Sequence, residues 1–443
     1  MGVQMLKHSQ FNHVVDVPGE NAWAVHNFAT GATERLDVLQ KALFDAAPTL
    51  PASSEVVRSW RAAGFLVPSD VDEPAILREL AEKRALEHAC GSGPFPLTLT
   101  ICVTEACNFA CPYCFQKTGT RHMSEEVQRA LVRFVEGRLA TGRHDRLEVD
   151  WFGGEPLLAL DVVEHLSGQF MRIAQRHEIP YRAMMHTNGY FLNQQAVDVL
   201  ERCSVRNVLV TIDGDRASHD AKRHLQSGGP TYDRIVANLR AIRTSMRIIV
   251  RCNLHESNVE SLPALVQLVE DIACETGNQM RVSPAAVRWA PANAERDDAT
   301  ELLSFERYAR ILSQYGRVEK ADPFRPVLSA CGMTRLNELQ IQADGAIFPN
   351  CHNAPDIPPV ALGSVFDDEP IDWEAAARRI FDTLGFPDER SECLSCKLLV
   401  CCHGGCHGLR WVHDGKATCS EYRADPDSYV LGRLAQTSGG TVL

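Results

Sequence analysis

Three cysteines, Cys107, Cys111 and Cys114, lie close together in a C-x3-C-x2-C arrangement. Thiolates at this spacing can bind one metal centre, but a structural zinc ion takes four ligands and a cubane iron–sulfur cluster has four irons. Three cysteines on a cubane therefore leave one iron open to a molecule other than the protein. An incomplete ligand set of this kind indicates catalysis. The alternative is a zinc knuckle whose fourth ligand lies elsewhere in the chain.

Of the 16 cysteines in the chain, eight lie from Cys331 onward. Cys401, next to Cys402, is a spare thiol that either substitutes for its neighbour or packs in a core. The other seven, whose spacing suits two separate metal centres, are Cys331, Cys351, Cys393, Cys396, Cys402, Cys406 and Cys419. A structural zinc site is the alternative to iron–sulfur clusters in this region. Five scattered cysteines are interpreted as small buried apolar residues, and these are Cys90, Cys102, Cys203, Cys252 and Cys274.

The first cysteine group resembles the cluster loop of the radical S-adenosylmethionine (SAM) enzymes, including an aromatic residue, Tyr113, just before the third cysteine. The resemblance implies that Cys107, Cys111 and Cys114 hold a [4Fe–4S] cluster whose open iron chelates the amino and carboxylate groups of SAM. In this family, one electron from the cluster cleaves SAM to methionine and a 5′-deoxyadenosyl radical, which abstracts a hydrogen atom from the substrate. An electron donor such as flavodoxin or ferredoxin is therefore implied as a partner.

The stretch from Leu97 to about Ala290 alternates apolar strands with helical stretches. Alternation of this kind predicts parallel strands joined by crossovers, with the site residues in the loops that follow the strands. The predicted strands are 97–103, 149–152, 181–185, 208–212 and 246–251, and the predicted helices include 125–139, 162–176 and 232–243. By resemblance, residues 95–315 form a partial (β/α)6, TIM-like barrel of the α/β class.

Four short polar motifs follow successive predicted strands. In the first, two glycines let the backbone approach a ligand, and the carboxylate of Glu155 can accept hydrogen bonds from an ammonium group. Taken alone, each motif also fits ordinary turn chemistry, and Arg223 and Arg251 also fit structural ion pairs. Because all four motifs follow the cysteine loop in the chain, one after each successive strand, together they resemble the SAM-binding turns of the radical SAM family. The residues to which this resemblance assigns SAM contacts are Tyr113, Gly153, Gly154, Glu155, Pro156, Thr187, Asn188, Thr211, Asp213 and Arg223.

Residues 1–90 are predicted to form a small α+β module. The predicted strands are 11–17, 23–28 and 33–37, and the predicted helices are 38–45, 54–62 and a linker helix at 73–88. Strands followed by helices at this size resemble a winged-helix-like leader-peptide recognition domain, which binds a precursor peptide by adding it as a strand to the edge of its sheet. The alternative is a capping domain that covers the barrel.

The C-terminal cysteines, within residues 325–430, resemble the SPASM domain of radical SAM enzymes, which carries two auxiliary [4Fe–4S] clusters. The ligands that the resemblance assigns are Cys393, Cys396, Cys402 and Cys419 for one cluster, and Cys331, Cys351 and Cys406 for the other. The second set has only three cysteines, so the fourth iron of that cluster is either open or bound by a non-cysteine ligand such as His352 or an Asp. Asp344-Gly345 predicts a hairpin, but five residues separate Gly345 from Cys351 where the family pattern has four.

The composition excludes several classes of function. The chain has 443 residues, enough for two or three domains, and its net charge of −12 argues against nucleic acids and anionic membrane surfaces as partners. No apolar run reaches the length of a membrane span, and the first residues lack the apolar core of a secretory signal. We therefore expect a cytoplasmic protein that binds neither nucleic acid nor membrane.

Together, these features predict a radical SAM peptide maturase that installs a cross-link or an oxidised residue in a ribosomally made precursor peptide. One alternative is an anaerobic sulfatase-maturating-type enzyme that forms formylglycine and needs no leader-binding module. A non-enzymatic iron–sulfur or zinc scaffold that binds peptides is the other. Candidates for a general base are His186, His219 and His352, because imidazole titrates near neutrality. A core or surface role is the alternative for each of these histidines.

Overall fold

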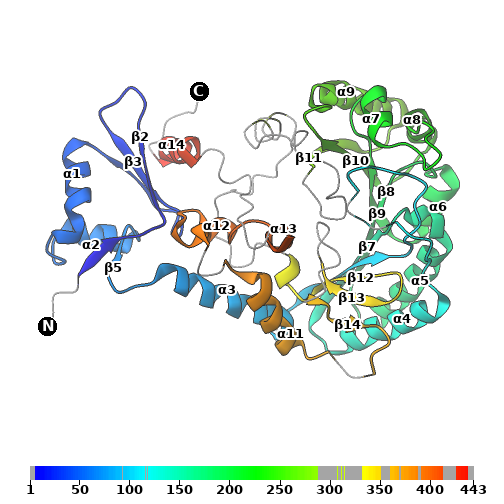
Figure 1. Ribbon diagram of the computed structural model, residues 1–443, viewed down its shortest axis with the longest axis horizontal. Coiled ribbons are helices and arrows are strands. Elements are labelled where there is room, and N and C mark those ends of the chain that lie inside the picture. The colour runs from blue at the N-terminus through cyan, green and yellow to red at the C-terminus, as the bar shows by residue number, and fades with distance from the viewer. Residues whose placement is uncertain are drawn as a thin grey trace. The chain divides into compact units, whose positions relative to one another are not determined.

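The computed structural model describes residues 5–287 apart from 92, 115 and 117, the isolated residues Arg307, Ile311 and Gln314, and residues 332–350, 360–368, 371–387, 391–412 and 426–437. The chain divides into two compact units (Figure 1). Among the described residues, the first unit combines those of 1–85 with those of 384–443. The second unit combines those of 86–318 with those of 332–383.

The second unit is built on a sheet that has nine strands within the described residues, in the order β11-β10-β9-β8-β7-β6-β12-β13-β14. Six neighbouring strands are parallel and follow chain order, and they are β6 (Phe95–Cys102), β7 (His144–Phe152), β8 (Tyr181–Thr187), β9 (Val205–Thr211), β10 (Arg247–Leu254) and β11 (Met280–Ala286). This arrangement confirms the predicted α/β fold with six parallel strands.

Three further strands extend the same sheet beyond β6. β12 (Glu338–Ile341) pairs parallel to β6, while β13 (Ala346–Pro349) and β14 (Gly363–Ser364) continue antiparallel. The turn between β12 and β13 contains Asp344-Gly345, and Gly345 has φ +90°, a conformation that glycine adopts without strain. The hairpin predicted from this dipeptide is confirmed. Gly332–Thr334 (η6) precedes these strands, and α11 (Trp373–Ile380) and the π-helical turn Phe381–Gly385 follow them.

Helices connect the parallel strands and lie along the outer side of the sheet (Figure 1). They are α4 (Glu125–Ala140), α5 (Leu160–Arg176), α6 (Gln194–Arg202), α7 (Arg216–Lys222), α8 (Tyr232–Ala241) and α9 (Leu262–Thr276), with the short 3-10 turns η2 (Pro156–Ala159) and η3 (Val259–Ser261). Local signals explain where several of them begin, because the side chains of Ser124, Asn193 and Asp215 each accept a hydrogen bond from the first turn. The three helices predicted here are confirmed.

Two strands of the barrel differ from the sequence prediction. β7 begins at His144, whereas the predicted strand begins at Val149, because the polar segment His144-Asp145-Arg146 carries no hydrophobic alternation. The sequence does not predict β11, whose serine, proline and alanines have low strand propensity. Strand β11 forms because its backbone pairs with β10 from Met280 onward, which is a tertiary rather than a local cause.

The first unit contains a three-stranded antiparallel sheet, β2 (Asn12–Asp16), β3 (Trp23–Asn27) and β4 (Thr33–Leu36), and a two-stranded pair, β1 (Leu6–His8) with β5 (Leu66–Pro68). Its helices are α1 (Val38–Ala46), η1 (Ala47–Thr49), α2 (Glu55–Ala62), α3 (Glu73–Cys90, which continues into the second unit), η9 (Glu392–Ser395), α12 (Leu399–Cys402), α13 (His407–Val412) and α14 (Pro426–Thr437). The predicted strands and helices of the N-terminal module are confirmed.

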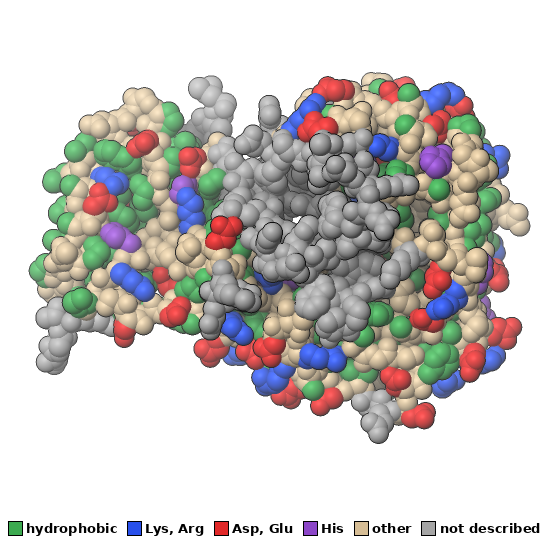
Figure 2. Space-filling view, viewed as in Figure 1, with side chains coloured by type: hydrophobic (Ala, Val, Ile, Leu, Met, Phe, Trp, Pro, Cys, Tyr) green, Lys and Arg blue, Asp and Glu red, His purple; other side chains and the backbone are tan. Residues whose placement is uncertain are grey.

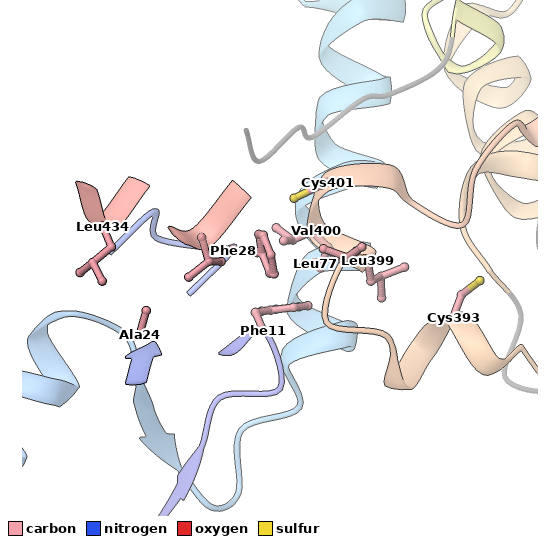
Figure 3. Packing of buried hydrophobic residues seen from close by; sticks show 11 residues of the cluster. Phe11, Ala24, Phe28, Leu77, Cys393, Leu399, Val400, Cys401 and Leu434 are labelled. Carbon is pink, nitrogen blue, oxygen red and sulfur yellow. The ribbon is translucent and has the colours of Figure 1, made fainter. Parts of the chain in front are cut away.

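One apolar cluster joins the N-terminal sheet to the C-terminal cysteine region (Figure 3). Phe11, Ala24 and Phe28 from the N-terminal sheet region pack with Leu399 and Val400 of α12. Val430 and Leu434 of α14 and Leu77 of α3 complete the cluster. The predicted boundaries separate residues 1–90 from residues 325–430, whereas this core groups the described parts of 1–85 and 384–443 in one unit. Shared burial of apolar area therefore makes the two segments stabilise one another.

Two surface features complete the description. Figure 2 shows hydrophobic side chains around α1, where Val38, Leu39 and Leu43 are exposed. No helix in the described part of the chain is long and apolar enough to cross a bilayer. Of the scattered cysteines, Cys102, Cys203 and Cys252 are buried as predicted, Cys90 is only half-buried and Cys274 is exposed, so the interpretation as a buried residue is wrong for Cys274.

Candidate functional site

The carboxyl ends of the parallel strands open onto a cavity of about 510 Å³ in the second unit. The thiols of Cys107, Cys111 and Cys114 all line it. Its wall also contains residues from the ends of β7 to β11 and the loops after them, among them Phe152, Gly153, Gly154, His186, Thr187, Asn188, Thr211, Arg223, Arg251, Asn253 and Ser283. The structure thus gathers the cysteine loop and most of the predicted strand-end residues around one space.

Two glycines allow the cysteine loop to pack against the end of β7. The N–H of Gly154 donates to the carbonyl of Thr104 at 2.8 Å, and the N–H of Glu155 donates to the carbonyl of Ala106 at 2.8 Å. A Cβ on Gly153 would lie 2.4 Å from the Thr104 oxygen, and one on Gly154 would lie 2.3 Å from the Ala106 oxygen. Gly153 also has φ +129°. These glycines therefore serve the packing of the loop as well as the cavity wall.

The surroundings of the three thiols oppose their ionisation. Burial raises the pKa of Cys107 to about 12 and that of Cys111 to about 11, and burial also raises the pKa of Cys114. Nearby thiols add to the shift at Cys107, so three thiolates here need a positive charge among them. A cationic iron centre supplies that charge. The Phe109 N–H already donates to the Cys107 sulfur at 3.4 Å, as it would to a ligating thiolate.

Within the described residues, no three His, Cys, Asp or Glu side chains converge closely enough to hold a single metal ion. This spacing does not conflict with a cluster site, because a cubane takes each cysteine on a different iron and holds the sulfurs further apart than one ion does. Three thiols that share one cavity therefore fit a polynuclear centre better than a mononuclear zinc site.

The structure shows which protein groups the Glu155 carboxylate contacts, and its predicted contact with an ammonium group stays a prediction. Its carboxylate is completely buried and does not line the cavity. It accepts hydrogen bonds from the Thr187 hydroxyl at 2.7 Å, the Asn188 N–H at 2.7 Å and the Leu157 N–H at 3.0 Å. Burial raises the pKa of Glu155 despite these three donors. Glu155 is thus a positioning residue that ties the loop after β8 to the loop after β7.

Thr187 and Asn188, which both donate hydrogen bonds to Glu155, also line the cavity. The Thr187 hydroxyl also accepts from the Gly189 N–H at 3.0 Å. The side-chain amide of Asn188 donates to the Asn108 Oδ1 at 2.8 Å and accepts from the Tyr190 N–H at 3.0 Å. Asn108 belongs to the cysteine loop, and the sequence analysis does not single it out. Its contact links the loop to the end of β8.

Tyr113 is the centre of a second buried network. Its hydroxyl donates to the Asp213 carboxylate and accepts from Arg223 Nη1 at 2.7 Å and from Asn253 Nδ2 at 3.3 Å. Asp213 is completely buried, and its second oxygen accepts from the Asn253 N–H at 2.8 Å. In this network Asp213 positions the Tyr113 hydroxyl and the backbone of Asn253, and its predicted contact with SAM stays a prediction. Burial raises the pKa of Tyr113 well above its usual value, so the phenol stays protonated.

Two further predicted residues lie outside the cavity wall. Pro156 is buried at the start of η2, where its ring packs inside the unit. His219 is completely buried: its Nδ1 accepts from the Asp213 N–H at 3.1 Å, so its Nε2 donates to the Thr231 hydroxyl at 3.0 Å. Burial, and then Arg223, lower the pKa of His219 to about 3, which excludes it as a base near neutrality. His186, in contrast, lines the cavity.

The C-terminal cysteines are described in part. Burial, and then Cys396 and Cys393, raise the pKa of Cys402, so these three thiols lie within electrostatic reach of one another. Cys401 is buried in the apolar cluster with Leu399 and Val400, and it packs there. This arrangement supports Cys402 as the metal ligand of the pair. The predicted ligands Cys331, Cys351 and Cys419, together with His352, lie outside the described residues.

Comparison with known proteins agrees with this site. Residues 101–269 match the family model described as the Radical SAM superfamily. The chain is 25% identical over 365 residues to the PqqA peptide cyclase of Ruegeria pomeroyi, a match that covers 78% of this chain and 92% of that protein.

Two solved structures share the fold. The first is native anSMEcpe with bound AdoMet and Kp18Cys peptide, which has a TM-score of 0.57 at 18% identity and covers 78% of this chain and 99% of that one. The second is Streptococcus suis SuiB bound to precursor peptide SuiA, which has a TM-score of 0.51 at 14% identity and covers 95% of this chain and 100% of that one. At these identities the likeness is one of fold.

Proposed function

We propose that the chain is a radical SAM enzyme, with its radical SAM domain in residues 101–269, and that it is a peptide maturase that abstracts hydrogen from a ribosomally made precursor peptide. One observation carries the proposal. Cys107, Cys111 and Cys114 line the same cavity as the residues at the ends of β7 to β10. A cluster and its cosubstrate would therefore lie at the carboxyl end of the barrel, where parallel α/β folds bind their ligands.

Within that cavity, Cys107, Cys111 and Cys114 would hold a [4Fe–4S] cluster with one open iron. When bound, the cluster and SAM supply a 5′-deoxyadenosyl radical. Thr187, Asn188 and Thr211 offer hydroxyl and amide groups for the polar parts of SAM. The buried hydrogen bonds of Glu155 and Asp213 would hold these loops in place around SAM.

The C-terminal cysteines would bind two auxiliary [4Fe–4S] clusters and accept the electron that remains after bond formation in the peptide. The electrostatic proximity of Cys393, Cys396 and Cys402 supports one such centre. An external donor such as flavodoxin or ferredoxin would reduce the SAM cluster.

The N-terminal module would bind the leader of the precursor peptide. The sheet β2-β3-β4 leaves β2 and β4 at its edges, where an extended peptide can add a strand. Helix α1 follows β4 directly in the chain. Its Leu39 and Leu43 are four residues apart, so they lie on the same side of the helix, and both are exposed. Since the formylglycine-forming alternative needs no leader-binding module, these features favour a maturase that uses a leader.

A point variant tests this role better than a deletion. Removing residues 1–90 would also remove Phe11, Ala24 and Phe28 from the core that covers Leu399 and Val400. The double variant L39E/L43E changes only exposed side chains, with Ile76→Glu on α3 as the matched exposed control. With a short peptide encoded beside this gene as the probe, we expect L39E/L43E to lose at least 10-fold in affinity and to keep uncoupled SAM cleavage. If the affinity of L39E/L43E for the peptide is unchanged, the N-terminal module does not bind the leader and only covers the barrel.

The catalytic assignment is tested with the triple variant C107A/C111A/C114A and the control Cys274→Ala, whose thiol is exposed on α9. On protein purified without oxygen, we expect about twelve irons per chain in the wild type and the control, and about eight in the triple variant. The triple variant should form no 5′-deoxyadenosine with SAM and reductant. Continued formation of 5′-deoxyadenosine would refute the assignment. If the wild type instead holds about four irons per chain, the triple variant holds none and zinc is present, the C-terminal cysteines form a structural zinc site rather than auxiliary clusters.

A further inference from the structure

One imidazole belongs to the wall of the cavity. His186 is the last residue but one of β8, and it lines the cavity together with Phe152 of β7 and Leu209 of β9. The ring of His186 lies edge-on to the ring of Phe152, with the two centroids 5.1 Å apart and the ring planes at 83°. On the other side, His186 pairs in register with Leu209. The neighbouring strands therefore hold this imidazole at the space where the peptide would react.

Among the described residues of the wall, His186 is the group that can take up a proton near neutral pH. No Asp or Glu of the described residues lines the cavity, and its arginines, Arg223 and Arg251, keep their charge. The phenol of Tyr113 also keeps its proton, because burial raises its pKa well above the usual value. The three thiols are the proposed ligands of the cluster. Imidazole is the side chain that accepts a proton in this range.

A carboxyl group lies behind this imidazole. Asp150 is on β7, two residues before Phe152, and its Oδ2 lies 4.0 Å from His186 Nε2. This distance is too long for a hydrogen bond but short enough for a charge interaction. The side chains of His186 and Asp150 are 22% and 19% exposed, so water reaches both. A protonated ring at His186 is therefore stabilised whenever the Asp150 carboxyl is ionised.

Two further carboxylates act on Asp150. They are Glu148 of the same strand and Glu338 of β12, and each is paired with an arginine of its own. Burial first, and then repulsion from these two carboxylates, raise the pKa of Asp150 to about 7. Near neutral pH the Asp150 carboxyl therefore exists in both protonation states, and it can release its proton when His186 gains one.

We propose that His186 takes up the proton released when the new bond forms in the peptide, and that Asp150 is a positioning residue that stabilises the resulting imidazolium. This inference rests on the proposed function and adds a catalytic residue to it. Loss of one hydrogen atom to the 5′-deoxyadenosyl radical leaves a radical at a peptide carbon. As that carbon bonds to a nucleophilic atom of the peptide, the bond from this atom to its hydrogen breaks. The proton goes to a ring nitrogen of His186, and one electron goes to a one-electron acceptor, a protein-bound iron–sulfur cluster.

The first test measures the modified peptide formed per 5′-deoxyadenosine, with the short peptide encoded beside this gene as the probe. His186→Gln should keep its iron and should form 5′-deoxyadenosine within about twofold of the wild type. Its yield of modified peptide per 5′-deoxyadenosine should fall at least about 10-fold, because the proton has no acceptor. Added imidazole should restore this yield in His186→Ala. The control is His165→Gln, which changes an exposed histidine of α5 and should behave as the wild type.

The second test requires neither peptide nor turnover. Nuclear magnetic resonance of the full chain labelled with ¹⁵N-histidine should show the His186 ring changing protonation between about pH 5 and pH 8. The signal is identified by its absence from His186→Gln. In Asp150→Asn the midpoint of this change should fall by about 0.5–1 pH unit, because the ring loses a negative neighbour. The acidic limb of the pH profile for modified peptide should move in the same direction.

The outcomes separate this inference from the proposed function. An unchanged yield of modified peptide per 5′-deoxyadenosine in His186→Gln would overturn the role of His186. The same holds if His186→Gln forms no 5′-deoxyadenosine, because the histidine would then serve SAM binding. Equal midpoints in the wild type and Asp150→Asn would overturn the pairing of the two residues. Each of these results leaves the proposed function intact, whereas a wild type that forms no 5′-deoxyadenosine from SAM would overturn the proposed function itself.

Discussion

Asp150 on β7 is the carboxylate whose replacement should change the stability of the barrel most clearly with pH. Two other carboxylates lie on neighbouring positions of the same sheet: Glu148 on β7 and Glu338 on β12, which both pair in register with Thr98 of β6. Each of these has an arginine partner within 3 Å, Arg146 Nε at 2.9 Å and Arg335 Nη1 at 2.8 Å. Asp150 has no arginine or lysine within ion-pair distance among the described residues; the His186 ring, which is charged only when protonated, places its Nε2 at 4.0 Å from the Asp150 carboxylate.

The size of the effect follows from the pKa. Burial, and then repulsion from Glu148 and Glu338, raise the pKa of Asp150 from 3.8 to about 7. Because the folded protein prefers the protonated acid, the contribution of Asp150 is fully present below about pH 4 and is lost as the pH rises through about 7. The rise in the pKa corresponds to a contribution on the order of 4 kcal/mol to the free energy of unfolding. About 3 kcal/mol of this contribution is lost between pH 5 and pH 8.

The variant Asp150→Asn removes this titration and keeps the shape of the side chain. Urea unfolding followed by circular dichroism should show the wild type losing about 3 kcal/mol more than Asp150→Asn between pH 5 and pH 8. Asp145→Asn is the matched control, because Asp145 lies on the same strand but is exposed. It should behave as the wild type. Equal pH dependence in the wild type and Asp150→Asn would refute the argument that burial and the two carboxylates raise this pKa.

Three further substitutions test how the site is held together. Glu155→Gln turns one accepting oxygen into a donor that faces the Thr187 hydroxyl or the Asn188 N–H, so we expect a loss of about 2 kcal/mol in the free energy of unfolding and weaker SAM binding by calorimetry. Tyr113→Phe removes the hydroxyl shared by Asp213 and Arg223 and should weaken SAM binding about 10-fold while iron content stays the same; unchanged affinity would contradict this role. Gly153→Ala brings a Cβ within 2.4 Å of the Thr104 oxygen and should release iron from the cysteine loop, whereas Gly137→Ala, with open space around it on α4, should stabilise by about 0.5–1 kcal/mol.

Much of the secondary structure follows from local sequence. The predicted helices 125–139 and 162–176 agree with α4 (Glu125–Ala140) and α5 (Leu160–Arg176) within one or two residues. Their hydrophobic period is a property of a short segment, and the capping side chain of Ser124 marks the start of α4. The cysteine loop is equally local, since its three cysteines, Cys107, Cys111 and Cys114, lie close together in the sequence. Local signals therefore determine the elements and the type of chemistry.

The roles of individual site residues depend on the tertiary structure. Glu155 and Asp213 follow strands in the predicted way, but both carboxylates are completely buried and hold other loops. The direction of a side chain just after a strand depends on the path of the next loop and on the strands beside it, which no local pattern encodes. The same reason applies to Gly153, whose nearest neighbour is the Thr104 carbonyl of another loop.

Long-range packing also decided the grouping of segments. Phe11, Phe28 and Leu399 belong to one core in the structure. The sequence does not indicate this grouping, because period and composition do not encode which faces meet. Cys401 and Cys402 are indistinguishable by type, and only the packing of Cys401 among Leu399 and Val400 distinguishes it from Cys402. The sequence alone thus determined the barrel, the cysteine loop and the kind of reaction. Only the tertiary structure decided which side chains face the cavity, because those contacts join residues far apart in the chain.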